Sequence, residues 1–107
     1  MSSKKLNVLV LGGGGREHVI CWKLSQSRRI NNLFCIPGNS GIERIAKTTS
    51  DINITDFSRI QDFSLENNID IIFVGPELPL VKGIKNFFEN TNVKVFGPSL
   101  QAAQLEG

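Results

Sequence analysis

Residues 6–18 have the sequence Leu6-Asn-Val-Leu-Val-Leu-Gly-Gly-Gly-Gly-Arg-Glu-His18. The almost wholly apolar run before the glycines is typical of a strand that is covered on both faces in a parallel sheet. Good helix formers and an apolar cluster follow over residues 16–27 and predict a helix, with Val19, Trp22 and Leu24 in the core. A strand, a glycine-rich turn and a helix are therefore the expected start of the fold.

Further apolar runs alternate with helical patterns along the rest of the chain. Strands are predicted over residues 33–36, 51–54, 69–74 and 93–96, and helices over 57–63, 80–88 and 100–106, with Thr55 or Asp56 capping the helix that begins at 57. A parallel neighbour cannot be reached by a tight turn, so these strands must be joined by crossovers. We expect a Rossmann-like α/β fold, in which a doubly wound parallel five-stranded sheet, in the strand order 3-2-1-4-5, forms the middle of three α/β/α layers.

Size, charge and cysteine content exclude several classes of protein. The 107 residues suit one domain, and 12 Lys+Arg against 10 Asp+Glu leave +2 with no basic block, which argues against nucleic acid. The six mostly apolar residues 6–11 are too few for a membrane span. Cys21 and Cys35 form no C-x-x-C motif and the chain has one histidine, so neither a zinc site nor a disulfide is indicated. A cytoplasmic protein with a small-molecule ligand fits best.

The expected topology selects two loops before any motif is considered. The crevice of such a sheet opens at the carboxyl ends of the strands where the winding reverses, which are followed here by Gly12–Gly15 and Gly75–Pro79. Four glycines before a helix let the backbone approach a ligand and direct amide hydrogens at it, as in a phosphate site. The dinucleotide fingerprint fails, because its third glycine would fall at Glu17 and no acidic residue follows the second strand. No Lys-Ser/Thr follows the glycines, so this is not a Walker loop.

The polar residues of the two loops each allow two interpretations. Arg16 could pair with a phosphate or be a solvated surface arginine. Glu17 is better placed to accept hydrogen bonds from the free amides of the helix start than to face a phosphate. His18 could bond a ligand oxygen, although a lone helical histidine is more often packed or exposed. Glu77, between two prolines, suits a sugar diol or the start of the next helix, and the topology favours ligand contact.

Taken together, several motifs resemble the N-terminal domain of the phosphoribosylamine–glycine ligase family. They are Gly12-Gly-Gly-Gly-Arg-Glu-His18, Pro37-Gly-Asn39, Gly75-Pro-Glu77, Phe96-Gly-Pro98 and Ala102-Ala-Gln-Leu-Glu106. The resemblance implies a pre-ATP-grasp domain of an enzyme that joins glycine to 5-phosphoribosylamine with ATP hydrolysis in purine synthesis, through an acyl phosphate of glycine. It also implies substrate-binding roles for Gly13, Gly14, Gly15, Arg16, Glu17, His18, Gly38, Asn39, Pro76 and Glu77.

The sequence departs from the family pattern at its end. The family continues into a serine-lysine segment and then the ATP-grasp and C-terminal domains, which bind ATP and Mg²⁺ or Mn²⁺, whereas this chain ends at Gly107. We expect a domain with no catalytic residue, metal or cofactor of its own, which is inactive alone and has those domains as partners. Two alternatives stay open: the equivalent domain of another ATP-grasp ligase, such as a biotin carboxylase-like or carboxyaminoimidazole synthetase-like protein, and a stand-alone nucleotide-sensing Rossmann module.

Overall fold

The computed structural model describes residues 4–97. Along the chain the elements are β1 (Leu6–Gly12), α1 (Gly15–Ser25), β2 (Ile30–Pro37), the 3-10 helix η1 (Ile42–Arg44), β3 (Lys47–Thr48), α2 (Phe57–Glu66), β4 (Ile71–Val74), α3 (Glu77–Val81), α4 (Ile84–Phe87) and β5 (Lys94–Phe96). Most predicted elements lie within three residues of these bounds, and Asp56 caps α2 by accepting a hydrogen bond from the amide of Arg59. The helix predicted over residues 100–106 lies outside the described residues.

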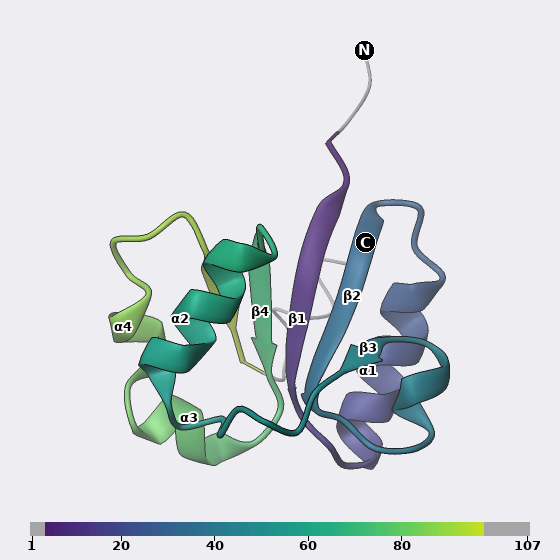
Figure 1. Ribbon diagram of the computed structural model, residues 1–107, viewed down its shortest axis with the longest axis horizontal. Coiled ribbons are helices and arrows are strands. Elements are labelled where there is room, and N and C mark those ends of the chain that lie inside the picture. The colour runs from purple at the N-terminus through teal and green to yellow at the C-terminus, as the bar shows by residue number, and fades with distance from the viewer. Residues whose placement is uncertain (1–3, 98–107) are drawn as a thin grey trace.

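The five strands form one sheet in the order β3-β2-β1-β4-β5. Every pair of neighbours is parallel, which confirms the predicted doubly wound topology. In the central register Leu11 of β1 lies beside Ile36 of β2 and Val74 of β4. β1 and β4 therefore end at the same edge of the sheet, and the loops that follow them lie together at the bottom of Figure 1.

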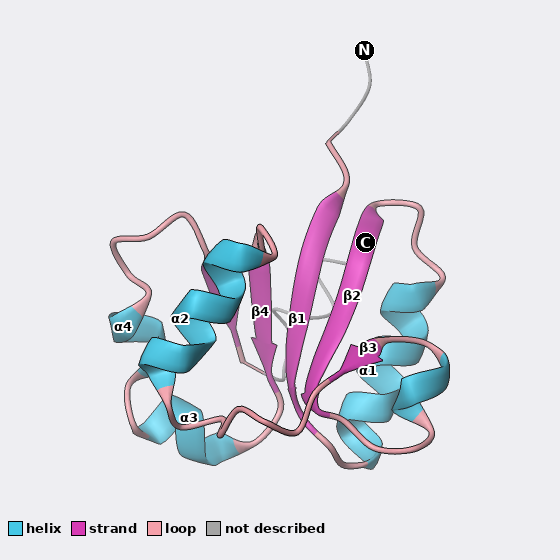
Figure 2. Cartoon of the chain, viewed as in Figure 1, coloured by secondary structure: helices cyan, strands magenta, loops and turns pink. Residues whose placement is uncertain are grey.

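Alternating residues of β1 face two separate layers of helices. Leu9 and Leu11 are buried in one apolar cluster with residues of α2 and α4. Val8 and Val10 are buried in the other with Cys21 and Leu24 of α1. The sheet is thus covered by α1 on one face and by α2 and α4 on the other, as Figure 2 shows, which confirms the three layers. Burial of these side chains is the main stabilising contribution to such a fold.

The third strand is not where the sequence pattern placed it. Strand β3 is Lys47–Thr48, paired with β2, whereas residues 51–54 form bends and turns. Ile52 and Ile54 do pack against the core, so the alternation of apolar and polar residues over 51–54 correctly indicates which side chains are buried. However, the side chain of Asn53 accepts hydrogen bonds from the amide and hydroxyl of Thr55. This local turn directs the chain into α2 and away from the sheet.

The helix predicted over residues 80–88 is two short helices. Gly83 separates α3 from α4 with a φ of 94°, a left-handed conformation that ends α3. Its amide donates to the carbonyl oxygen of Leu80. Ile84 and Phe88 are buried as the apolar pattern indicated, while Phe87 is more exposed. The predicted stripe is therefore correct in burial for Ile84 and Phe88, wrong for Phe87, and wrong as a continuous helix.

The outer face of α1 carries two apolar residues that were predicted to lie in the core. Trp22 is 49% exposed and Val19 is 60% exposed, whereas Leu24 is buried as expected. The buried face of α1 is formed by Glu17, Cys21 and Leu24. This spacing of four and three residues fixes the inward direction, so Val19 and Trp22 point outward.

Candidate functional site

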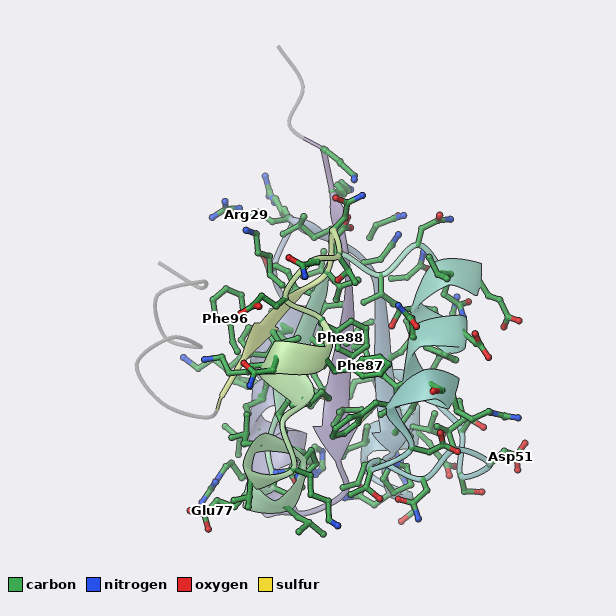
Figure 3. The ribbon with its side chains drawn as sticks, turned by 90° about the vertical axis from the view of Figure 1, so that its left-hand side faces the viewer. Arg29, Asp51, Glu77, Phe87, Phe88 and Phe96 are labelled. Carbon is green, nitrogen blue, oxygen red and sulfur yellow. The ribbon has the colours of Figure 1, made fainter. Side chains whose placement is uncertain are left out.

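A cleft lies at the predicted position, where β1 and β4 end. The loops after these strands line a cavity of about 610 Å³ with Gly14, Gly15, Arg16, Glu17, Gly75, Pro76 and Glu77. Figure 3 shows Glu77 at the opposite end of the molecule from Arg29, which precedes β2. The cleft is thus at the carboxyl edge of the parallel sheet, where ligands bind in open α/β folds.

The four glycines after β1 differ in what surrounds them. A β-carbon at Gly12, which has a φ of 128°, would lie 2.6 Å from Cδ of Glu17, and one at Gly13 would lie 2.6 Å from the carbonyl oxygen of Gly38. At Gly14 it would lie 3.2 Å from Oε1 of Glu17. At Gly15 nothing lies within 4 Å. Packing within the protein therefore explains why residues 12 and 13 are glycines, and it leaves little room for a side chain at Gly14. Of the four glycines, only Gly15 has free space around it.

The start of α1 offers backbone donors to the cleft. Gly14 is the N-cap, and its amide donates to Oε1 of Glu17 at 2.7 Å. This bond confirms the predicted capping role of Glu17. No oxygen in the described part of the chain accepts from the amides of Gly15 and Arg16. These two first-turn donors lie at the positive end of the helix dipole, where an anion is favoured.

Arg16 and Glu77 border the cleft from its two loops. Nη1 of the exposed Arg16 side chain donates to the carbonyl oxygen of Gly75 at 3.3 Å, so the guanidinium reaches across to the second loop. Its remaining N–H groups are available to a ligand. Pro76 is the N-cap of α3 and Glu77 its first residue, exposed and part of the cavity lining. Glu77 thus occupies both predicted positions, at a helix start and at the cleft.

Two of the other three predicted site residues, Gly38 and Asn39, bond to the glycine loop (residues 12–15) from the side of β2, whereas His18 of α1 packs against the loop that follows β2. Nδ2 of Asn39 donates to the carbonyl oxygen of Gly13, and its Oδ1 accepts from the amide of Ile42, both at 2.9 Å. Gly38, with a φ of 73°, donates its amide to the carbonyl oxygen of Gly12. The ring of His18 packs against Gly41, where a β-carbon would lie 2.6 Å from Cε1. None of these three residues is among those that line the cavity.

Sequence reasoning missed the roles of Gly75 and Gly41. A β-carbon at Gly75 would lie 2.5 Å from Cδ of Glu17, so this glycine accommodates the glutamate of α1. Gly41 does the same for His18. A glycine directly after a buried strand could have signalled Gly75, because that strand end faces the glycine loop. The partner side chains, however, follow only from the tertiary structure.

Two buried thiols lie beneath the glycine loop. Sγ of Cys35 donates to the carbonyl oxygen of Gly12 at 3.2 Å, and both Cys35 and Cys21 are free and fully buried. A hydrogen bond with the Cys21 side chain, together with burial, raises the pKa of the Cys35 thiol well above its ordinary value. Cys35 is therefore a neutral donor that holds the end of β1, and not a nucleophile.

Residues 4–97 carry neither a metal-binding cluster nor a membrane-spanning helix. No three or more His, Cys, Asp or Glu residues come together there in a group that could hold a metal ion. None of the helices in this range has the length and apolar character that crossing a membrane requires.

Known proteins resemble this chain along nearly its whole length. Residues 6–106 match the model of the family described as phosphoribosylglycinamide synthetase, N domain. The chain belongs to this family. Phosphoribosylamine–glycine ligase from Caldanaerobacter subterraneus is 52% identical over 102 residues, which is 95% of this chain and 24% of that protein. The bifunctional purine biosynthetic protein PUR2,5 of Pichia angusta is 43% identical over 107 residues, which is 97% of this chain and 14% of that protein.

A solved structure supports the same assignment. The crystal structure of phosphoribosylamine–glycine ligase from Thermotoga maritima aligns with a TM-score of 0.52 at 25% identity, over 82% of this chain and 19% of that one. The chain thus spans about a quarter or less of the length of these members of the phosphoribosylglycinamide synthetase family. Membership in this family replaces the two alternatives, another ATP-grasp ligase and a stand-alone nucleotide sensor.

Proposed function

We propose that this chain binds 5-phosphoribosylamine, as the N-terminal domain of a phosphoribosylamine–glycine ligase in purine biosynthesis. Family membership supports the ligase. The binding role rests on the cleft at the carboxyl edge of the sheet. There an arginine and a carboxylate meet two first-turn amides that have no acceptor among residues 4–97. A sugar phosphate has one anionic end and several hydroxyl donors, which matches this set of groups.

Each group in the cleft has a proposed part in binding. The phosphate lies against the amides of Gly15 and Arg16, where the helix dipole and the guanidinium both favour negative charge. Glu77, across the cleft, accepts hydrogen bonds from the ribose hydroxyls. The other predicted residues have supporting parts. Gly14, Glu17 and Pro76 line the cleft, and Gly13, His18, Gly38 and Asn39 support the loops around it.

The remaining chemistry of the ligase belongs to other parts of the protein. We propose that ATP and Mg²⁺ or Mn²⁺ are bound by the further ATP-grasp and C-terminal domains that the family resemblance implies, and that the protein acts in the cytoplasm. These 107 residues are expected to bind substrate without turnover. A coupled ADP-release assay with glycine and phosphoribosylamine is expected to stay at background, and measurable turnover would refute this expectation.

Ligand-induced stabilisation tests the binding role. Ribose 5-phosphate is a stable probe with the same phosphate and ring, and at a hundred times its Kd it should stabilise the native chain by about 2.7 kcal/mol and raise its Tm. Ribose, which lacks the phosphate, should not, and NAD and ATP should have no comparable effect. A larger shift with NAD or ATP than with ribose 5-phosphate would contradict the proposed function.

A further inference from the structure

The carboxylate of Glu17 is enclosed by the backbones of both cleft loops. The residue is only 6% exposed, and its Oε1 accepts the amide of Gly14 at 2.7 Å. β-Carbons at Gly12 and Gly75 would lie 2.6 Å and 2.5 Å from its Cδ, too close for either position to carry a side chain without movement. The glycines at these two positions therefore make room for Glu17, and not for a ligand.

Charge argues against a direct contact between Glu17 and a phosphate. Two anions repel each other, and the repulsion is stronger in a partly buried cleft than in water. Glu17 also occupies the amide of Gly14, which would otherwise be a third donor at the start of α1. Both effects weaken anion binding, so an anion-binding role does not explain why a carboxylate lies here.

The contacts of Glu17 indicate a different role, which is to fix the two loops relative to each other. The side chain comes from α1, is bonded to the loop after β1 and is packed against Gly75 in the loop after β4. We propose that Glu17 is a positioning residue, which sets the separation of the two loops and thereby the direction of the Gly15 and Arg16 amides, without touching the substrate. The identity of the ligand rests on the proposed function, whereas the contact between the loops does not.

A conservative variant separates positioning from direct contact. Glu17→Gln keeps an acceptor oxygen for the Gly14 amide and removes the negative charge, so ribose 5-phosphate should bind with unchanged or tighter Kd. Glu17→Ala removes the acceptor and should weaken binding about tenfold, whereas the exposed Glu66→Ala, on α2, should change nothing. Calorimetry gives each Kd. If Gln binds as weakly as Ala, or if Ala binds as the native chain does, the proposal is wrong.

The facing glycine provides an independent test by a double-mutant cycle. Gly75→Ala inserts a methyl group into the position of the Glu17 carboxylate and should weaken binding about tenfold. In the Glu17→Ala background that space is empty, so Gly75→Ala should then change Kd less than about twofold. Equal effects of Gly75→Ala in the two backgrounds would show that the residues act independently and would overturn the proposal.

Hydrogen exchange of the Gly14 amide tests the positioning role of Glu17 without a ligand, and so independently of the proposed function. Its exchange, followed by NMR without ligand, should be slow in the native chain and in Glu17→Gln, and fast in Glu17→Ala. If the native chain fails to bind ribose 5-phosphate while this pattern holds, the proposed function fails and the positioning role of Glu17 stands. Fast exchange in the native chain, or slow exchange in Glu17→Ala, would overturn the positioning role itself.

Discussion

At the residue scale, the glycine loop illustrates how identical residues serve different purposes. Gly12 and Gly13 are required by neighbouring protein atoms, and only Gly15 faces open space. A glycine at the start of a helix is unfavourable unless something needs the room, because other residues favour the helix more. The proposed phosphate site would give a reason for Gly15, and this interpretation can be tested because no protein atom lies within 4 Å of a β-carbon there.

Gly15→Ala is expected to separate binding from stability. The methyl group would project into the cleft, so the free energy of unfolding should change by less than about 0.5 kcal/mol, while the Kd for ribose 5-phosphate should rise about tenfold. Urea denaturation and calorimetry measure the two quantities. Gly12→Ala is the matched comparison: its φ of 128° and the nearby Glu17 should make it destabilising by more than about 1 kcal/mol. An unchanged Kd for Gly15→Ala would remove the ligand explanation.

Among the helices and strands, the sequence predicted the strand order of the sheet better than the bounds of individual elements. Apolar runs that end in glycine and are separated by helices were sufficient for the strand order, because crossover connections leave few alternatives. The two-residue β3 carries too little sequence for any periodic signal. The break at Gly83 was overlooked because the apolar stripe continues across it, and only the left-handed φ reveals the end of α3.

Two residues of α1 provide a test of burial. Trp22 is larger than Leu24, but it should contribute less to the free energy of unfolding because it is more exposed. Trp22→Ala should cost less than about 1.5 kcal/mol of unfolding free energy, because Trp22 is 49% exposed. Leu24→Ala should cost about 2–5 kcal/mol, because Leu24 is 3% exposed within the core. Urea denaturation of both variants measures the difference. A larger loss for Trp22→Ala would mean that this side chain is buried after all.

At the scale of the whole molecule, the two cleft loops meet because the winding of the sheet reverses between β1 and β4. The sequence located both loops through this topology, and the capping role of Glu17 through its place in the first turn of the helix. It could not show that Asn39 bonds to Gly13, that His18 packs against Gly41, or that Gly75 accommodates Glu17, since each of these contacts joins residues that are distant in the chain. Such roles depend on side-chain directions that only the packed structure defines.

An NMR titration shows where on the chain a ribose phosphate binds. With ¹⁵N-labelled chain and ribose 5-phosphate, the amides of Gly15 and Arg16 should show the largest changes in chemical shift, followed by that of Glu77, with a single Kd. A ribose phosphate does not bind in this cleft if these amides stay unmoved while those of Lys23, Gln26 and Arg29 shift, around a cavity of about 270 Å³ at the start of β2.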